Sequence, residues 1–190
     1  MLLRTDCGTP VEWMKNENWH WFRYPFLSEG DTPEKREAAR KFLSQHGYKV
    51  AAVTMSFGDY LWPETYARCL AKEDSHAVQT LKDAYLKAAD DNLGYAHDAS
   101  QLLLGRDIPF VLLMHVGAST ADMLPSLLEL FRARGYEFVS LEEAEQDEFY
   151  RWDTEVNTPH VPDTFEGLAR ERHAALPAHP EPLDFAKLCR

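Results

Sequence analysis

The sequence has few basic residues and no long apolar run, and each shortage excludes a class of protein. Lys and Arg number 20 against 31 Asp and Glu, which gives a formal net charge of −11. Nucleic-acid binding depends mainly on Lys and Arg at the phosphates, so we expect no nucleic-acid partner. No apolar stretch approaches the roughly 20 residues of a transmembrane helix, so we also expect no membrane partner.

Cysteine is scarce as well. The three cysteines, Cys7, Cys69 and Cys189, are scattered and lack the spacing of metal ligands. Reduced thiols in the cytoplasm account for them most simply. Residues 1–4 are not followed by the apolar core of a signal peptide. We therefore expect a cytoplasmic protein, with the alternative that a targeting segment precedes the sequence given.

Length and composition favour one domain. The chain has 190 residues, 45% of them hydrophobic, which is enough to bury a sizeable core. We predict a single domain over residues 1–190. It would comprise an N-terminal segment at 1–18, a core at 19–150 and a proline-containing tail at 151–190.

Within that core, strand-like and helical patterns alternate. Apolar runs predict strands at about 19–24, 49–55, 108–115 and 136–140. Periodicity predicts helices or helical turns at about 33–46, 63–72, 74–104, 121–134 and 141–150. The expected capping residues are Thr32 and either Asp74 or Ser75 at helix starts, and Gly47, Gly105 and Gly135 at helix ends. Strands separated by helices indicate an α/β fold, with a mostly parallel sheet flanked by helices.

Polar side chains follow three of the predicted strands: Arg23, Asp59 and His115. Chemistry gathers at the carboxyl ends of parallel strands, so we expect all three on one rim. An imidazole there can act as general acid or base, and a carboxylate in hydrogen-bond reach would fix its tautomer and raise its pKa. Arg23 would offer a positive charge to a carboxylate or a developing oxyanion.

Each of these residues also has a purely structural interpretation. His115 can be a buried histidine paired with a backbone carbonyl, Asp59 a helix cap or turn residue, and Arg23 part of a surface ion pair. Trp62, which follows the predicted site, can stack on a sugar or belong to the core. A serine esterase is weakly supported, because no Gly-x-Ser-x-Gly motif surrounds a serine near the rim.

Three short motifs carry a resemblance to a known family: Arg23-Tyr24-Pro25-Phe26, Phe57-Gly58-Asp59-Tyr60 and Leu113-Met114-His115. In order and spacing they resemble the third, fourth and fifth motifs of the polysaccharide deacetylases, also called the NodB homology domain or carbohydrate esterase family four. The similarity runs from about Trp19 to about Ala144. Several motifs in register are more specific than any one of them alone.

The resemblance implies a partial or deformed (β/α) barrel, in which a divalent metal polarises an acetyl group and activates a water. By motif, His115 would be the acid that protonates the leaving group, and Asp59 the carboxylate that tunes it. Arg23 would hold the catalytic base. The substrate would be bound, with its acetyl methyl group in a pocket, by Leu113, Tyr60, Trp62 and Phe26.

The metal half of that machinery is missing from the sequence. The family places its base and first metal ligand in a Thr-Phe-Asp-Asp type motif, and two more ligands in a His-x-x-x-His type motif. Neither occurs here. Tyr60 also stands where a tryptophan is usual, and Ser56 where an aspartate is common. Zinc or a similar divalent metal is thus expected from the family, while its ligands are not found in this chain.

These observations predict a hydrolase that removes N- or O-acetyl groups from an acetylated carbohydrate or a small acetyl ester. Two alternatives stay open. One is a non-catalytic, truncated homologue that assembles through an exposed half-barrel, because an unpaired edge strand at 19–24 would be covered by a second copy in a homodimer. The other is a small acetyl esterase with a different nucleophile or metal site.

Overall fold

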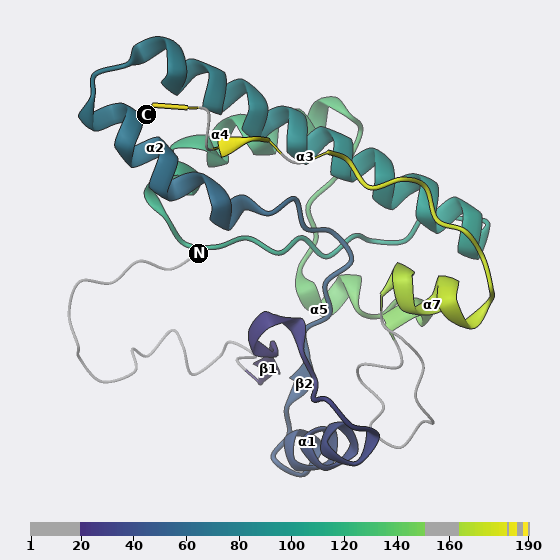
Figure 1. The fold of residues 1–190 in the computed structure, drawn as a ribbon. Helices are drawn as coiled ribbons and strands as arrows, with labels where there is room; N and C mark the ends of the chain where they lie inside the picture. The colour runs from purple at the N-terminus through teal and green to yellow at the C-terminus, as the bar shows by residue number, and fades with distance from the viewer. Residues whose placement is uncertain (1–19, 151–163, 182, 186–187, 190) are drawn as a thin grey trace. The chain divides into compact units, whose positions relative to one another are not determined.

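The computed structural model describes residues 20–150, 164–181, 183–185 and 188–189 (Figure 1). The chain divides into two compact units, Met1–Ala51 and Ala52–Arg190, called here the first and the second unit. The predicted (β/α) barrel is wrong. The residues that the structure describes are mostly helical, with 58% helix and 4% strand, and the strands among them make one two-stranded sheet.

The first unit contains a short parallel strand pair joined by one helix. Strand β1 (Trp21–Phe22) pairs with β2 (Lys49–Val50), with Trp21 opposite Lys49 and Phe22 opposite Val50. A single turn of 3-10 helix, η2 (Pro25–Leu27), follows β1, and helix α1 (Pro33–Gln45) leads to β2. The predicted strand at 19–24 is therefore paired within its own unit. The homodimer stays a prediction, but the unpaired half-barrel edge that motivated it is not observed.

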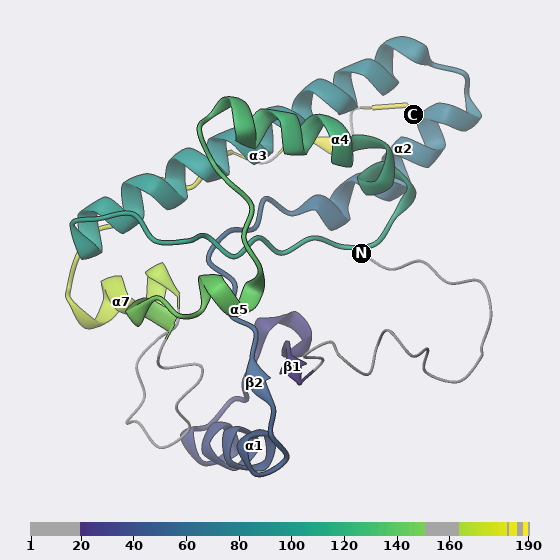
Figure 2. The ribbon, with the colours of Figure 1, turned by 180° about the vertical axis from the view of Figure 1, so that it is seen from behind.

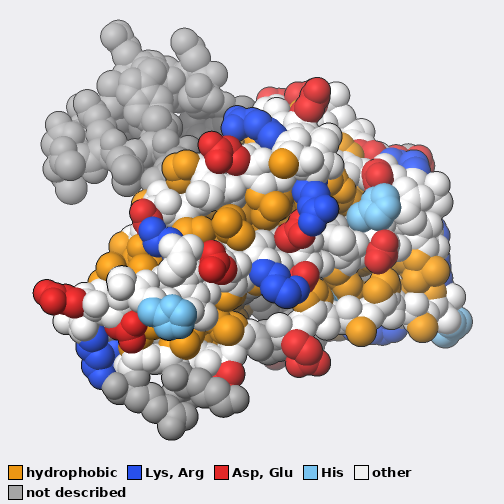
Figure 3. Space-filling view, turned by 90° about the horizontal axis from the view of Figure 1, so that it is seen from above, with side chains coloured by type: hydrophobic (Ala, Val, Ile, Leu, Met, Phe, Trp, Pro, Cys, Tyr) orange, Lys and Arg blue, Asp and Glu red, His pale blue; other side chains and the backbone are white. Residues whose placement is uncertain are grey.

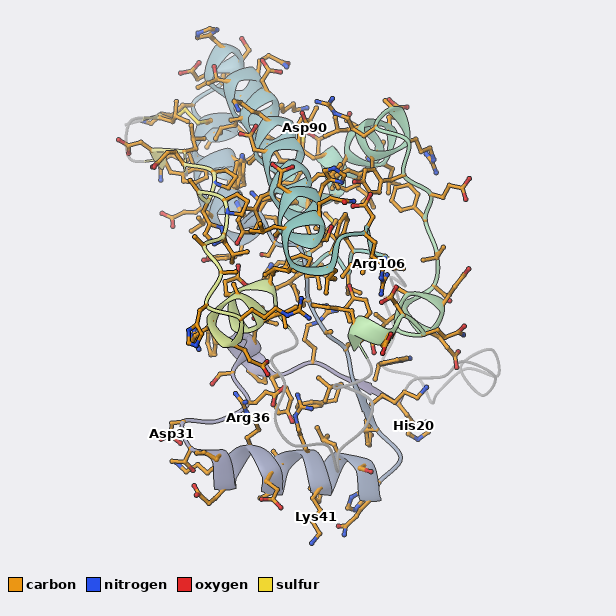
Figure 4. All side chains as sticks on the ribbon, turned by 90° about the vertical axis from the view of Figure 1, so that its right-hand side faces the viewer. His20, Asp31, Arg36, Lys41, Asp90 and Arg106 are labelled. Carbon is orange, nitrogen blue, oxygen red and sulfur yellow. A yellow bond between two sulfur atoms is a disulfide. The ribbon has the colours of Figure 1, made fainter. Side chains whose placement is uncertain are left out.

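Helix α1 begins and ends as its sequence predicts. The Thr32 side chain accepts a hydrogen bond from the backbone N–H of Lys35, at 3.3 Å, and Pro33 occupies the first turn. Past the helix, Gly47 has a φ of +75°, the left-handed conformation that commonly ends a helix. Arg36 and Lys41 project from opposite sides of α1 (Figure 4).

Three helices pack together in the second unit (Figures 1 and 2). The longest, α3 (Ser75–Leu104), has 30 residues and is about 45 Å long. Helices α2 (Trp62–Ala71) and α4 (Ala118–Ala133) pack against it and against each other. The shorter elements are η3 (Asp59–Leu61), α5 (Leu141–Ala144), η4 (Glu148–Tyr150) and α7 (Phe165–Glu171).

The sequence of α3 explains how it is buried. Small and apolar residues recur every three or four positions, so they share one stripe of the helix. The buried members of this stripe include Ala77, Leu81, Tyr85, Ala89, Leu93, Ala96, Ala99 and Leu103. Asp74 accepts the Ala77 N–H at 2.9 Å and so caps the start of α3, and Gly105 ends it at a φ of +71°. Both capping predictions are confirmed.

Two of the predicted strands are not strands. Residues 108–115 make only one parallel bridge, between Leu112 and Met55, and residues 136–140 are in no strand. The bridge is held by the Thr54 and Met55 N–H groups, which both donate to the Val111 carbonyl at 3.1 Å. The Leu113 N–H donates to the Met55 carbonyl at 3.0 Å. Two extended segments of the second unit thus run in the same direction.

A disulfide joins Cys69 on α2 to Cys189, 120 residues away in sequence. The expectation of reduced thiols is therefore wrong for this pair. Cys69 is completely buried, and the two Cα atoms are 5.3 Å apart. The cysteine spacing gave no sign of this bond, because the pairing depends on long-range packing of Cys189 beside α2.

On the face drawn in Figure 3, acidic and basic side chains are scattered among hydrophobic ones. In the part of the chain that the structure describes, no helix is both long enough and apolar enough to cross a membrane. The prediction of no nucleic-acid partner stays a prediction.

Asp122 on α4 ties the three long helices of the second unit together. Its Oδ2 accepts hydrogen bonds from the Tyr66 hydroxyl of α2, at 2.6 Å, and from Lys82 Nζ of α3, at 2.7 Å. The Lys82 contact, and then the Tyr66 hydroxyl, hold the pKa of Asp122 below its ordinary value of 3.8. The folded state is therefore favoured when Asp122 is ionised.

This contact predicts an acid-dependent loss of stability. The contribution of Asp122 is complete above its unfolded pKa and disappears as the pH falls through its lower folded pKa. We expect urea unfolding between about pH 6 and pH 2 to show this loss in the free energy of unfolding. In Asp122→Asn the acid-dependent loss should be smaller than in the wild type, by no more than about 1 kcal/mol, because the ion pair is partly exposed. The exposed Asp98→Asn control should keep the wild-type curve. An unchanged slope in Asp122→Asn would contradict the assignment.

Candidate active site

His115 and Asp59 form a closely bonded pair in the second unit. The Asp59 carboxylate is completely buried, whereas the His115 side chain is 45% exposed. Asp59 accepts the backbone N–H of His115 at 2.6 Å on one oxygen, and its other oxygen lies 2.8 Å from His115 Nδ1. A carboxylate accepts hydrogen bonds, so Nδ1 carries the proton and Nε2 remains available to a ligand. The predicted hydrogen bond is confirmed.

The two extended segments explain why these residues meet. They run parallel through the bridge between Met55 and Leu112, so the residues that follow them emerge at the same end. Asp59 comes four positions after Met55, and His115 three positions after Leu112. Gly58 turns the chain into η3 with a φ of +71°, a conformation that a side chain would strain. The turn places the Asp59 carboxylate within hydrogen-bond distance of His115.

Helix α4 starts directly beyond His115. Gly117 precedes its first residue, and a Cβ at this position would lie 3.3 Å from Pro63 Cγ of α2. The missing side chain thus lets the segment that carries His115 approach the start of α2 closely. In consequence the candidate site is surrounded by η3, the first turn of α2 and the first turn of α4.

Three hydroxyl groups are buried near this pair. The side chains of Tyr85, Ser119 and Thr120 are buried, and the Ser119 hydroxyl oxygen has no hydrogen-bond partner among the described residues. Burial raises the pKa of Tyr85 to about 12, partly offset by the interaction with the Thr120 hydroxyl and assisted by the charge of Asp59. Tyr85 is therefore a neutral hydroxyl at physiological pH. Its position in the apolar stripe of α3 gave no sign of the neighbouring carboxylate.

The residues predicted to bind substrate lie in different surroundings. Tyr60 is 59% exposed, and its ring centroid lies 5.2 Å from that of His115. Leu113 is half-buried on the segment that leads to His115. Trp62 is only 3% exposed, and its indole N–H donates to the Leu81 carbonyl at 3.1 Å. That burial favours the core interpretation of Trp62 over contact with a sugar.

Arg23 and Phe26 belong to the first unit. Arg23 Nε donates to the Ala51 carbonyl at 3.3 Å. Phe26 is fully exposed and has a φ of +55°. Their participation in a site with His115 stays a prediction, because the structure describes each unit by itself.

The expected divalent metal does not fit the described residues. A protein site for such a metal needs several His, Cys, Asp or Glu side chains that converge. Within residues 20–150, 164–181, 183–185 and 188–189, no group of three such side chains could hold a metal ion.

A cavity of about 580 Å³ lies on another part of the second unit. One of its charged pairs joins Arg134 and Asp90, which projects from α3 (Figure 4). Sequence reasoning gave no signal for this cavity. Its remaining lining residues are Asp91, Leu93, Gly94, Tyr95, His97, Asp98, Tyr136, Pro177, Ala178 and Pro180.

No protein-family model matches the chain, nor does any curated protein or solved structure. The similarity to polysaccharide deacetylases is therefore carried by the three motifs alone. The paired residues His115 and Asp59 belong to two of those motifs.

Proposed function

We propose that the chain is a hydrolase that removes acetyl groups from carbohydrate, with His115 as its acid–base residue. The observation that carries the proposal is the hydrogen bond from a half-exposed imidazole to a completely buried carboxylate. Such a partner fixes the tautomer and the orientation of the ring, which a catalytic histidine requires. A histidine that served only packing would not need a side chain that is 45% exposed.

His115 can perform both proton transfers of the reaction. In the first, Nε2 of the neutral imidazole accepts a proton from water while the water oxygen attacks the acetyl carbon. In the second, the same nitrogen donates that proton to the leaving oxygen or nitrogen as its bond to the carbonyl carbon breaks. The Asp59 carboxylate accepts the Nδ1–H and so stabilises the imidazolium that exists between the two steps.

The position of Tyr60 favours a carbohydrate as the substrate. Its ring lies edge-on to the imidazole, with an angle of 63° between the planes, and more than half of it is exposed. An exposed aromatic ring beside the reacting group offers an apolar face to a sugar and a hydroxyl to its polar edge. An acetyl ester is the more reactive test substrate, because its leaving group needs less assistance than an amine.

The test is an acetyl-release assay with p-nitrophenyl acetate, an O-acetylated sugar and an N-acetylglucosamine oligomer. His115→Gln should lower the rate on at least one substrate by about 10⁴-fold, the upper end of the contribution of a positioned acid–base group. His76→Gln is the matched control, because His76 is exposed in the first turn of α3. A wild-type rate equal to the buffer rate, or an unchanged rate in His115→Gln, would overturn the proposal.

A further inference from the structure

A segment near the end of the sequence, drawn in yellow, runs along α3 (Figures 1 and 2). We call the described residues between Pro177 and Cys189 the strap. Leu183, Phe185 and Leu188 of the strap pack against the larger core cluster of the second unit. The strap therefore lies at the surface of the second unit, with these three partly buried side chains packed against the core.

Phe185 connects the strap to the candidate active site. Its ring meets Trp62 edge-on, at a centroid distance of 4.7 Å and an angle of 82°. Trp62 in turn packs against Tyr85 at 5.4 Å. Trp62 is the first residue of α2 and directly follows η3. The ring of Phe185 thus supports the turn that carries Asp59.

The strap is also attached to α2 covalently. Cys189 is disulfide-bonded to Cys69, and the neighbouring Arg68 donates from Nε to the Cys189 carbonyl at 3.0 Å and from Nη2 to the Leu188 carbonyl at 3.4 Å. The disulfide and the aromatic contact therefore hold the strap to one helix, at Cys69 and at Trp62. Cys189 is the more accessible of the two cysteines, since Cys69 is completely buried.

We propose that the Cys69–Cys189 disulfide is a redox-controlled fastener for the active site. When it is intact, the strap holds Trp62 and η3 in place, so that Asp59 orients His115. When it is reduced, the strap loosens, support for Asp59 weakens and hydrolysis slows. The effect on hydrolysis rests on the proposed function, whereas the loosening of the strap does not.

The switching step uses a dithiol as reductant. One thiolate of the dithiol attacks Sγ of Cys189, the S–S bond breaks, and Cys69 leaves as a thiolate that takes up a proton. The second thiol of the reductant then displaces Cys189, which is also protonated. Two electrons pass to the protein, and the dithiol becomes a cyclic disulfide. The reverse reaction with an oxidised dithiol restores the bond.

The experiment compares the full chain before and after reduction with dithiothreitol. The first readout is the NMR signal of the Trp62 indole N–H, assigned with Trp62→Phe. The second is the acetyl-ester rate. Reduction should shift the Trp62 signal and lower the rate by at least about tenfold, because small displacements of catalytic groups are costly. Cys189→Ser should match the reduced protein without dithiothreitol, and Cys7→Ser should respond as the wild type does.

Phe185→Ala keeps both cysteines and tests the aromatic link if Cys189→Ser does not fold. It should lower the rate in the oxidised protein while circular dichroism shows the helices intact. A Trp62 signal that stays unchanged on complete reduction would overturn the fastener. A shifted Trp62 signal with no hydrolysis in either form would support the fastener and overturn the proposed function instead.

Discussion

Asp59→Asn is expected to lower the acetyl-ester rate by about 10³–10⁴-fold, the size of effect seen when the orienting aspartate of a catalytic triad becomes an amide. Asp59 accepts both the backbone N–H and the Nδ1–H of His115. An asparagine has one carbonyl oxygen and one amide N–H₂ group, so it can serve only one of the two donors. If the N–H₂ group faces the ring, it favours the tautomer with the proton on Nε2, which cannot accept a proton from water.

The measurement pairs kinetics with a spectroscopic signature of the ring. Steady-state rates give the loss of activity, and the ¹⁵N chemical shifts of the His115 imidazole report which nitrogen carries the proton. Asp83→Asn, on the exposed side of α3, is the control and should change neither. A wild-type tautomer together with a wild-type rate in Asp59→Asn would show that the carboxylate does not orient the histidine.

Leu127→Ala is expected to cost about 3–5 kcal/mol in the free energy of unfolding. Leu127 is completely buried on α4, in the cluster that also contains Leu81 and Tyr85 of α3. Truncating this side chain loses the transfer free energy of the removed methyl groups. It also leaves a cavity, so the surrounding side chains lose their packing contacts. Because folded domains are only marginally stable, a change of this size is a large part of the total.

Equilibrium unfolding in urea, with the helix signal followed by circular dichroism, measures this cost. Leu102→Ala is the matched control, because Leu102 lies on α3 with half of its surface exposed. The control should change the free energy of unfolding by about 0.5 kcal/mol or less. A loss below about 1 kcal/mol in Leu127→Ala would mean that α4 is not packed on α3 as described.

The helices could be predicted from the sequence because their signals are local. Thr32 and Asp74 each accept a hydrogen bond within three residues of their own position, so the pattern that predicts the cap also forms it. The apolar stripe of α3 needs only the helix itself to bring its members together. Helix α7 was missed, because it lies in a region whose prolines indicated an irregular tail.

The strands could not be predicted in the same way. The apolar run before His115 has the composition of a buried strand, but a strand also needs a partner along its whole length. Here residues 108–115 find that partner only at Leu112, and Phe110 packs against both core clusters. Burial among side chains and burial in a sheet give the same apolar run, so the sequence pattern cannot separate them.

The pairing of His115 with Asp59 was predicted because it needs only two segments that run in the same direction. The single bridge at Met55 and Leu112 is enough to provide that direction, even though the barrel does not form. Tyr85 and Cys189 could not be found in this way. Tyr85 comes from the middle of another helix, and the partner of Cys189 is 120 residues away.

The two hydrogen bonds that Asp59 accepts come from different parts of residue 115, its backbone and its side chain. Positions 59 and 115 are therefore under different constraints. One donor is the backbone N–H of residue 115, which any residue except proline would supply. The other is the imidazole itself. The Asp59 carboxylate thus closes the junction between two chain segments, whatever the protein does. Among related sequences, an aspartate at 59 would therefore indicate the shared architecture, and only a histidine at 115 would indicate that the chemistry is retained.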